Sequence, residues 1–229
     1  MVQTGMASTS DEIDHAVGRI AVEGDRMRLL VEELLMLARL DHGRPADLTT
    51  VDAGDVAESA VADAMAIGSD RPVTVQRGGD DLRVVVDAAS LRQAIDNLLA
   101  NTRAHTPVGT RVDVTVSRRE DDVVIAVDDD GPGIDEAEMH RVFDRFFRTE
   151  RSRARPGGSG LGLSIVAAVA ESHGGTVTAG RSPSGGARIT ITLPAAEPVH
   201  DSKPPPVEPG ASSPTGGSIR TDGPIRSER

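Results

Sequence analysis

Apolar residues recur at alternating four- and three-residue steps along residues 11–42, a spacing that places them on one face of a helix. The stripe consists of Ile13, Val17, Ile20, Met27, Val31 and Leu34, and it is widened by Leu30, Leu37 and Leu40. Thr9 or Ser10 is predicted to cap the start of the helix, and Gly43 with Pro45 to end it. A single helix cannot bury so wide an apolar face. We therefore expect a bundle helix whose partner is not part of this sequence, with packing against its own domain as the alternative.

From Asp47 the pattern changes to alternating strands and helices. The predicted strands cover residues 48–52, 72–76, 82–86, 110–118, 122–128, 175–181 and 186–193. The predicted helices cover residues 53–67, 89–104 and 161–172. Helices are few and the later strands come in adjacent pairs, which favours a mixed sheet with its helices on one face. The predicted fold class is α/β, a two-layer sandwich over residues 47–197 that follows the helical segment 1–46.

Residues 198–229 show neither the apolar spacing of a helix nor the alternation of a strand. They hold seven of the 14 prolines and almost no large apolar residue, which predicts a disordered tail. Such a tail could dock onto a partner, but we favour the interpretation that it is an extension without a selected function.

Composition excludes several classes of protein. The 229 residues include no cysteine, so disulfides and thiolate metal sites are excluded. The single lysine is Lys203 in the predicted tail, whereas a Walker A loop or a eukaryotic-type protein kinase needs a lysine on the phosphates. The net charge of −11 argues against general nucleic-acid binding. No apolar run reaches the roughly 18 residues of a membrane span, and no signal peptide is seen, so we expect a cytoplasmic chain that can associate with a membrane sensor partner.

Two asparagines lie one turn apart on the predicted helix 89–104. Asn97 and Asn101 face the same way, and neutral amides can offer an oxygen to Mg²⁺ and donate to phosphate oxygens. His105, just beyond, could also donate to a phosphate. The alternatives are a solvated helix face for the asparagines and a helix cap for the histidine.

The first glycine turn, DDDGPGI at 128–134, follows the alternating strand VVIAV. Gly131 and Gly133 make a tight turn that lets a flat ligand approach the backbone, with a carboxylate beneath it. Adenine suits such a site, because its exocyclic amino group is a donor that a buried carboxylate accepts. The alternative is an ordinary acidic β-turn.

The second glycine turn, GGSGLGL at 157–163, leads directly into the apolar helix SIVAAVAESHGG. Free backbone N–H groups at a helix start form an anion site. A dinucleotide-binding turn is disfavoured because GxGxxG is not matched and the expected strand does not lead into the turn. Phosphate binding is therefore the preferred interpretation.

A lid is predicted between the two glycine turns. Residues 141–155 contain six arginines and all three phenylalanines of the protein, Phe143, Phe146 and Phe147. A long segment of this kind between ordered elements is typical of a functional lid. The alternative is a surface loop with a small hydrophobic anchor.

The order NLLAN…HTP, DDDGPGI, RFFR, GGSGLGL and HGG resembles the N box, first glycine box, F box and second glycine box of bacterial sensor histidine kinases, within the GHKL ATPase superfamily. The resemblance covers residues 11–195, since RMRLLVEELLMLARLDHGR looks like the second helix of their dimerisation domain. It implies the two-layer ATP-binding fold of that superfamily (the Bergerat type), with ATP and Mg²⁺ as cofactors.

The resemblance also implies roles for single residues. Asn101 would bind Mg²⁺, and Asp129 would accept from adenine N6. Asn97 and His105 would lie along the phosphates. The nucleotide would further be lined by Gly131, Gly133, Ile134, Gly158, Gly160, Leu161, Gly162 and Leu163, with Phe147 and Arg148 in the lid. One position departs from the family pattern, because Ala104 stands where many relatives have Lys or Arg.

A larger departure is the absence of the phospho-acceptor. The family transfers the γ-phosphoryl to a histidine in a sequence like HELRTPL, and nothing here matches it. His15 is followed by Ala16 and Val17 rather than by an acid, and His42, His140 and His173 are interpreted as structural. No catalytic residue is therefore assigned.

The sequence thus predicts the ATP-binding catalytic part of a two-component histidine kinase, acting on a histidine supplied in trans and not expected to autophosphorylate alone. The expected partners are an acceptor-helix protein or the rest of a split kinase, a response regulator indirectly, and a second copy paired through 11–42. The alternatives are a nucleotide-binding regulator without transfer activity, a GHKL ATPase, and an inactive truncated kinase.

Overall fold

The computed structural model describes residues 5–41, 47–66, 71–149 and 159–197, and the segment up to Glu197 forms one compact unit. The predicted tail 198–229 lies outside the described residues. The helices are α1 (Gly5–Asp41), α2 (Ala53–Ala66), α3 (Ala88–His105) and α5 (Gly162–Ser172). The strands are β1 (Leu48–Asp52), β2 (Val73–Gly78), β3 (Arg83–Asp87), β4 (Val112–Arg119), β5 (Asp122–Asp129), β6 (Thr176–Arg181) and β7 (Ala187–Pro194).

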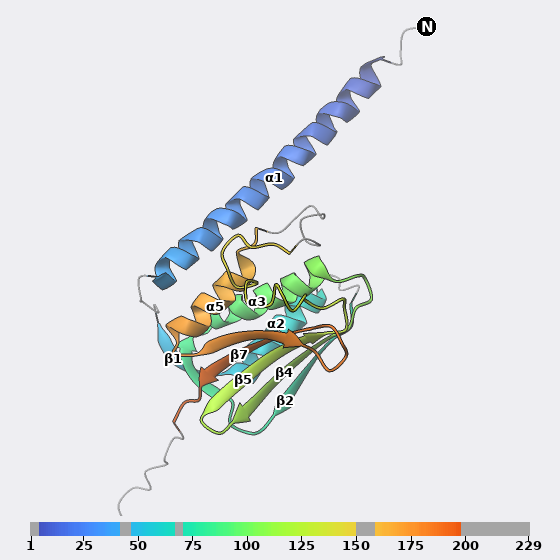
Figure 1. Cartoon of the computed structure of the whole chain (residues 1–229). Helices are drawn as coiled ribbons and strands as arrows, with labels where there is room; N and C mark the ends of the chain where they lie inside the picture. The colour runs from blue at the N-terminus through green and yellow to red at the C-terminus, as the bar shows by residue number, and fades with distance from the viewer. Residues whose placement is uncertain (1–4, 42–46, 67–70, 150–158, 198–229) are drawn as a thin grey trace, which may run out of the picture. The chain divides into compact units, whose positions relative to one another are not determined.

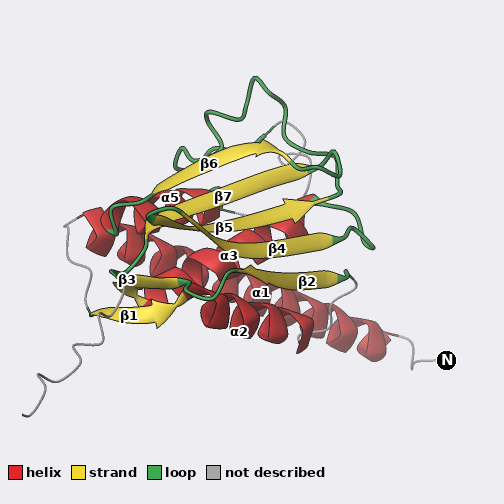
Figure 2. Cartoon of the chain, turned by 90° about the horizontal axis from the view of Figure 1, so that it is seen from below, coloured by secondary structure: helices red, strands yellow, loops and turns green. Residues whose placement is uncertain are grey.

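Five strands form one mixed sheet in the order β2-β4-β5-β7-β6. Only the β2–β4 pair in this sheet is parallel. Helices α2, α3 and α5 lie together on one face of the sheet (Figure 1), and the view from below shows the strands side by side in front of them (Figure 2). This confirms the predicted two-layer sandwich. One difference is that β1 and β3 pair with each other in a separate antiparallel sheet.

The core lies between the five-stranded sheet and the helices. Alternate side chains of β4 and β5 are at most 3% exposed: Val112, Val114, Val116, Val123, Ile125 and Val127. The helices meet them with Leu91, Ala94, Ile95 and Leu98 of α3 and with Ile165, Val166 and Val169 of α5. Each fully buried side chain of this size contributes about 1.5–3 kcal/mol. The core therefore fixes α3 and α5 against the sheet, and these two helices carry the polar face and the helix start of the predicted site.

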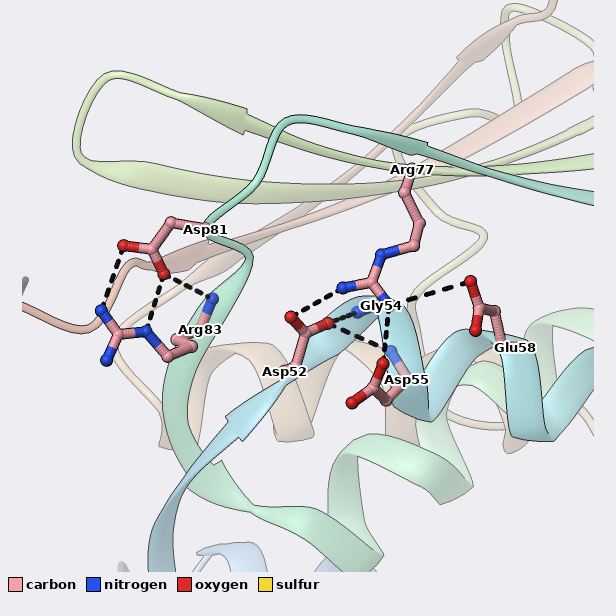
Figure 3. Close-up of polar contacts among 7 residues, drawn as sticks. All are labelled: Asp52, Gly54, Asp55, Glu58, Arg77, Asp81 and Arg83. Atoms are coloured by element: carbon pink, nitrogen blue, oxygen red, sulfur yellow. Dashed lines mark hydrogen bonds and ion pairs between the residues drawn. The ribbon is translucent and has the colours of Figure 1, made fainter.

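One carboxylate holds the corner between β1 and α2. Asp52 Oδ1 accepts from the backbone N–H groups of Gly54 (2.8 Å) and Asp55 (3.1 Å), which caps the helix. Asp52 Oδ2 accepts from Arg77 Nη2 on β2 at 2.7 Å (Figure 3). Arg77 Nη1 also donates to Asp55 Oδ1 at 2.6 Å, and this hydrogen bond raises the pKa of Arg77. These bonds tie the small sheet to an edge strand of the large one.

Helix α1 differs from its prediction in two respects. It begins at Gly5, so Thr9 and Ser10 lie inside the helix and are not its caps. The nine apolar positions also divide into two sets. Leu37 is 2% exposed in the core, with Leu30 and Leu40 packed against it, whereas the six stripe residues are 46–72% exposed: Ile13, Val17, Ile20, Met27, Val31 and Leu34. Leu30, Leu37 and Leu40 therefore do not widen the free stripe.

Packing of α1 against its own domain is therefore seen on one face, and a bundle partner on the other face stays a prediction. One face of its last turns packs against the domain, where α5 is its main neighbour, and the stripe stays open. Within the described residues, no helix is long and apolar enough to cross a membrane.

The first prediction tests this division of faces. Leu37→Ala removes a buried side chain and should cost about 2 kcal/mol or more at the α1–α5 contact. The amides of α5 should then exchange with deuterium about thirtyfold faster or more, because each 1.4 kcal/mol corresponds to a factor of ten in an equilibrium. Leu34→Ala, one turn away on the exposed stripe, should leave exchange in α5 unchanged. Equal effects of the two substitutions would contradict the packing.

Candidate nucleotide-binding site

A pocket of about 360 Å³ opens between α3, the turn after β5, the segment 142–149 and the start of α5. Its size is typical of a small-molecule site. Its walls include these residues predicted from the sequence: Asn97, Asn101, His105, Asp129, Gly133, Ile134, Phe147, Arg148, Gly160, Gly162 and Leu163. The fold therefore brings all four motifs to one cavity.

Two described residues of the predicted site are not in the wall, and a third predicted residue cannot be placed. Gly131 stands behind it, where a Cβ would lie 2.8 Å from Thr106 Cγ2. Leu161 is fully buried in the hydrophobic core. Gly158 lies outside the described residues.

Helix α3 turns one polar face to the pocket. Asn97, Asn101 and His105 follow one another at four-residue spacing, which keeps them on one side of the helix. Ala100 and Ala104 lie between them and leave room for a ligand. The opposite face is buried through Leu91, Ala94, Ile95, Leu98 and Leu99. The amphipathic pattern that builds the core thus also aims the polar side chains.

The amide of Asn97 has an unmet hydrogen-bond requirement. Its Nδ2 is buried and has no acceptor among the residues the structure describes, while its Oδ1 accepts weakly from Gln93 Nε2 at 3.5 Å. A Cβ at Gly162 would lie 4.0 Å from Asn97 Cβ, so the start of α5 is close by. A buried donor without an acceptor costs about 1–3 kcal/mol. A ligand oxygen here would recover that cost, and the residues present therefore fit an oxygen-rich anion.

Asp129 is the buried carboxylate of the pocket. It ends strand β5 and is 7% exposed. Its Oδ1 accepts from the backbone N–H groups of Gly131 at 2.9 Å and Ala187 at 3.1 Å. No described residue donates to Oδ2. One carboxylate oxygen is thus fixed by the backbone, and the other can accept from a donor on a ligand.

The neighbouring carboxylate is used differently. Asp128 makes a bidentate pair with Arg188, with both N–O distances at 2.6 Å, and this hydrogen bonding raises the pKa of Arg188. Successive side chains of a strand point to opposite faces, so Arg188 does not reach Asp129. The pair holds β5 to β7 and leaves the charge of Asp129 without a cationic partner among the described residues.

The predicted lid is described up to Thr149. Val142 is buried and Phe143 packs against the core, which anchors the segment. Phe147 and Arg148 line the pocket, and the Arg141 guanidinium lies 4.6 Å from the centre of the Phe147 ring. The remaining arginines of the segment, at 151, 153 and 155, lie outside the described residues.

Phe146 departs from the expected anchoring role of the phenylalanines. It is 61% exposed and its φ is +63°, a left-handed conformation that is uncommon for an aromatic residue. Its backbone N–H donates to Gly160 O at 2.9 Å, and a Cβ at Gly160 would lie 2.8 Å from Phe147 O. Glycine at 160 therefore allows the lid and the second glycine turn to lie against each other.

Helix α1 forms a wall that the sequence did not predict. Leu30 and Glu33 line the pocket, and Ser159 Oγ donates to Glu33 Oε2 at 2.8 Å. The same hydroxyl accepts from the N–H of Leu161 at 3.1 Å. Helix α5 has no side-chain cap bond at its N-cap residue Leu161, in keeping with the predicted anion site.

The sequence predicted the two strands of the β6–β7 hairpin but not its place at the site. Ala187 lines the pocket, and Ser182 Oγ donates to the carbonyl oxygen of Asp129 at 2.6 Å. The adjacent Gly185 and Gly186 were a possible signal, since paired glycines mark a tight turn. Nothing local, however, links that turn to a residue more than fifty positions earlier.

The chain is similar in sequence and in fold to proteins of a known family. A family model described as "Histidine kinase-, DNA gyrase B-, and HSP90-like ATPase" matches residues 86–197. The probable sensor histidine kinase TcrY of Mycobacterium tuberculosis is 44% identical over 185 residues, which cover 80% of this chain and 39% of TcrY. The chain thus spans about two fifths of that relative.

Two solved structures are similar over nearly their whole length. The mycobacterial sensor histidine kinase MprB has a TM-score of 0.58 and 33% identity, covering 64% of this chain and 98% of that one. The ATP binding domain of PrrB from Mycobacterium tuberculosis has a TM-score of 0.55 and 33% identity, covering 66% and 99%.

The unmet amide of Asn97 generates the second prediction. Asn97→Leu keeps a similar volume and removes the buried donor, so the free energy of unfolding without nucleotide should rise by about 1 kcal/mol or more. Asn101→Leu is the matched control, since no buried unpaired atom is found there, and it should bring no such gain. Urea unfolding of both variants measures the difference. A loss of stability in Asn97→Leu would show that its amide is satisfied within the protein.

Proposed function

Because the chain belongs to the histidine kinase-, DNA gyrase B- and HSP90-like ATPases, and within them to the bacterial sensor histidine kinases, we propose that it binds Mg-ATP for phosphoryl transfer to a histidine supplied in trans. The observation that carries the proposal is the arrangement of Asp129, whose Oδ1 is held by two backbone N–H groups while Oδ2 is left for a ligand. It lies in one pocket with the polar face of α3 and the start of α5.

In this proposal, Asp129 recognises the base of the nucleotide. The exocyclic amino group of adenine donates a hydrogen bond, and a carboxylate oxygen with no donor of its own accepts it. Guanine presents a carbonyl oxygen at the same position and would face Oδ2 with a second acceptor. Gly131 and Gly133 support this role, since side chains there would crowd Thr106 and Gly186.

The phosphates extend along α3 toward α5. Asn97 Nδ2 and His105 donate to phosphate oxygens, and the backbone N–H groups of Gly162 and Leu163 contribute the anion site of α5. Asn101 offers its amide oxygen to Mg²⁺, which commonly keeps most of its waters. Bound Mg²⁺ would neutralise phosphate charge. Phe147 and Arg148 belong to the lid over this end, and Gly160 gives the lid its close approach.

The domain contributes to transfer by positioning and by charge neutralisation. Catalysis then depends on a histidine nitrogen reaching the γ-phosphorus at about 3–3.5 Å. His15 and His140 are exposed, on α1 and in the lid respectively. His173 Nε2 accepts from the N–H of Asp87 at 3.0 Å, and this ring nitrogen therefore has a structural role.

The acceptor helix would cover the open stripe of α1. The six stripe residues are exposed together on one helix, and an apolar face of that length is typical of a bundle. A second copy of the chain is the other occupant we expect at this face. A response regulator would receive the phosphoryl group from the histidine and is an indirect partner.

The third prediction concerns base recognition. Asp129→Asn can place an NH₂ group opposite the adenine amino group and should lower ATP affinity by about 1–3 kcal/mol, or roughly 5- to 150-fold. GTP should bind the unmodified protein poorly. Titration with fluorescent nucleotide competitors measures both. Asp130→Asn is the matched control, because Asp130 is exposed and only accepts from the N–H of Arg111. Equal ATP and GTP affinities in the unmodified protein would refute the assignment of Asp129.

The fourth prediction concerns transfer. With labelled ATP alone, the chain should form little or no acid-labile, base-stable phosphohistidine. Adding a helical protein that carries an HELRTPL-like acceptor should produce it. Val31→Glu with Leu34→Glu should abolish that transfer and leave ATP affinity nearly unchanged, because neither side chain lines the pocket.

The control for the stripe is Leu48→Glu, which charges an equally exposed leucine on β1 and should preserve transfer. Strong self-phosphorylation that disappears in His15→Gln would overturn the requirement for a separate acceptor and make His15 the acceptor. ATP binding without transfer to any acceptor would favour a nucleotide-binding regulator.

A further inference from the structure

The β6–β7 hairpin folds around one buried hydroxyl group. Ser182 is 4% exposed, and its Oγ donates to the Asp129 carbonyl oxygen at 2.6 Å and accepts from the N–H of Gly186 at 2.9 Å. The backbone closes the same turn, since Ser182 N–H donates to Gly186 O at 3.0 Å. Both hydrogen-bonding capacities of the hydroxyl are therefore used, one on the hairpin and one on the end of β5.

This hairpin delivers one of the two donors to the Asp129 carboxylate. Ala187 follows Gly186 directly, and its N–H donates to Asp129 Oδ1. A displacement of the turn would move that N–H relative to the carboxylate. The angle at the hydrogen of a hydrogen bond is preferably above about 150°, and the bond weakens steeply below about 120°. A displacement of the turn should therefore weaken the hydrogen bond from Ala187 N–H to Asp129 Oδ1.

The approach of the hairpin to Asp129 leaves no free space. A Cβ on Gly186 would overlap the carbonyl oxygen and Oδ1 of Asp129 and would lie 2.7 Å from the Gly131 nitrogen. The turn and the strand end therefore fit together only with glycine at 186. Ser182 is the side chain that bonds the two, although it does not line the pocket.

We propose that Ser182 is a positioning residue for base selectivity: its hydroxyl holds the β6–β7 turn against Asp129, so that Oδ1 stays on backbone donors and Oδ2 faces the 6-amino group of adenine. The inference rests on the proposed function, in which Asp129 accepts from adenine. It adds that the selectivity of Asp129 depends on a residue outside the pocket.

The consequence is specific to the base. The phosphate-binding groups come from α3 and from the start of α5, and these elements are fixed by the core and not by the hairpin turn. Loss of the Ser182 hydroxyl should therefore weaken the contact with the 6-amino group and spare the phosphate contacts. A merely structural role would weaken every nucleotide alike.

The test compares ATP with purine riboside triphosphate, which has the same ring and phosphates but no 6-amino group. The unmodified protein should prefer ATP by about tenfold or more, since a site built to hydrogen-bond a group rejects the analogue that lacks it. In Ser182→Ala, ATP affinity should fall by about tenfold while affinity for purine riboside triphosphate stays within about twofold. The preference for ATP should then nearly disappear.

Two further variants complete the experiment. Ser184→Ala is the matched control, because Ser184 lies in the same turn and is exposed, and it should keep the full preference. Ser182→Cys keeps a weak donor of similar shape and should lose part of the preference. If Ser182→Ala does not fold, the preference of Ser182→Cys for ATP provides the test instead.

The outcomes separate the two proposals. Equal weakening of both nucleotides in Ser182→Ala and Ser182→Cys, or an unchanged preference in both, would overturn the role of Ser182 while leaving adenine recognition by Asp129 intact. If the unmodified protein already binds the two nucleotides equally, the assignment of Asp129 falls, and the inference about Ser182 falls with it.

Discussion

A carboxylate buried beneath a ligand pocket has to be satisfied by hydrogen bonds, and the construction of this domain's pocket follows from how Asp129 meets that requirement. Its partners among the described residues are two backbone N–H groups, so within that part of the chain its negative charge is stabilised without being matched by a cation. The adjacent Asp128 takes Arg188 on the other side of the strand. Because backbone donors must come close, Gly131 and Gly186 have no room for a side chain. The same requirement joins the end of β5 and the β6–β7 hairpin, two segments distant in the sequence, at one point.

The proposed phosphate end of the pocket follows a different rule. Among the described residues that line the pocket, Arg148 is the only arginine and there is no lysine, and the donors near α3 and α5 are mostly neutral amides and backbone N–H groups. Such groups can bind an anion through fixed dipoles, and in the proposed function charge neutralisation would come from Mg²⁺ and the lid arginines. Glu33 runs against this trend. It accepts the hydrogen bond of the Ser159 hydroxyl, which could otherwise be donated to a phosphate oxygen near the start of α5.

Much of the fold could be read from the sequence because its determinants are local. The alternation in residues 110–128 predicted β4 and β5, and the periodicity of residues 89–104 predicted α3 together with its polar face. The tight turn at Gly131-Pro132-Gly133 could likewise be predicted, because it depends on these three residues alone. The hydrogen bond from Ser182 to Asp129 spans 53 positions and could not be predicted, since a buried serine in a turn has no sequence signature. The pairing of β1 with β3 in a separate sheet is a similar case, since register is a tertiary property.

Helix α1 shows the limit of periodicity in another way. Its nine apolar positions were correctly placed on a helix, but periodicity gives an angle around the axis and not the identity of what the angle faces. Leu37 is covered by the domain and Val31 is open, although both belong to the same apolar pattern.

The separation of these two faces of α1 matters for the proposed transfer. A helix seated on the stripe touches a side of α1 other than the one that carries Leu30 and Glu33 into the pocket, and an α-helix with its side chains is about 10–12 Å across. For a histidine on that helix to come within about 3–3.5 Å of a γ-phosphate, we expect α1 to shift against the domain. Such a shift would break the Glu33–Ser159 hydrogen bond and the packing of Leu37 in the core.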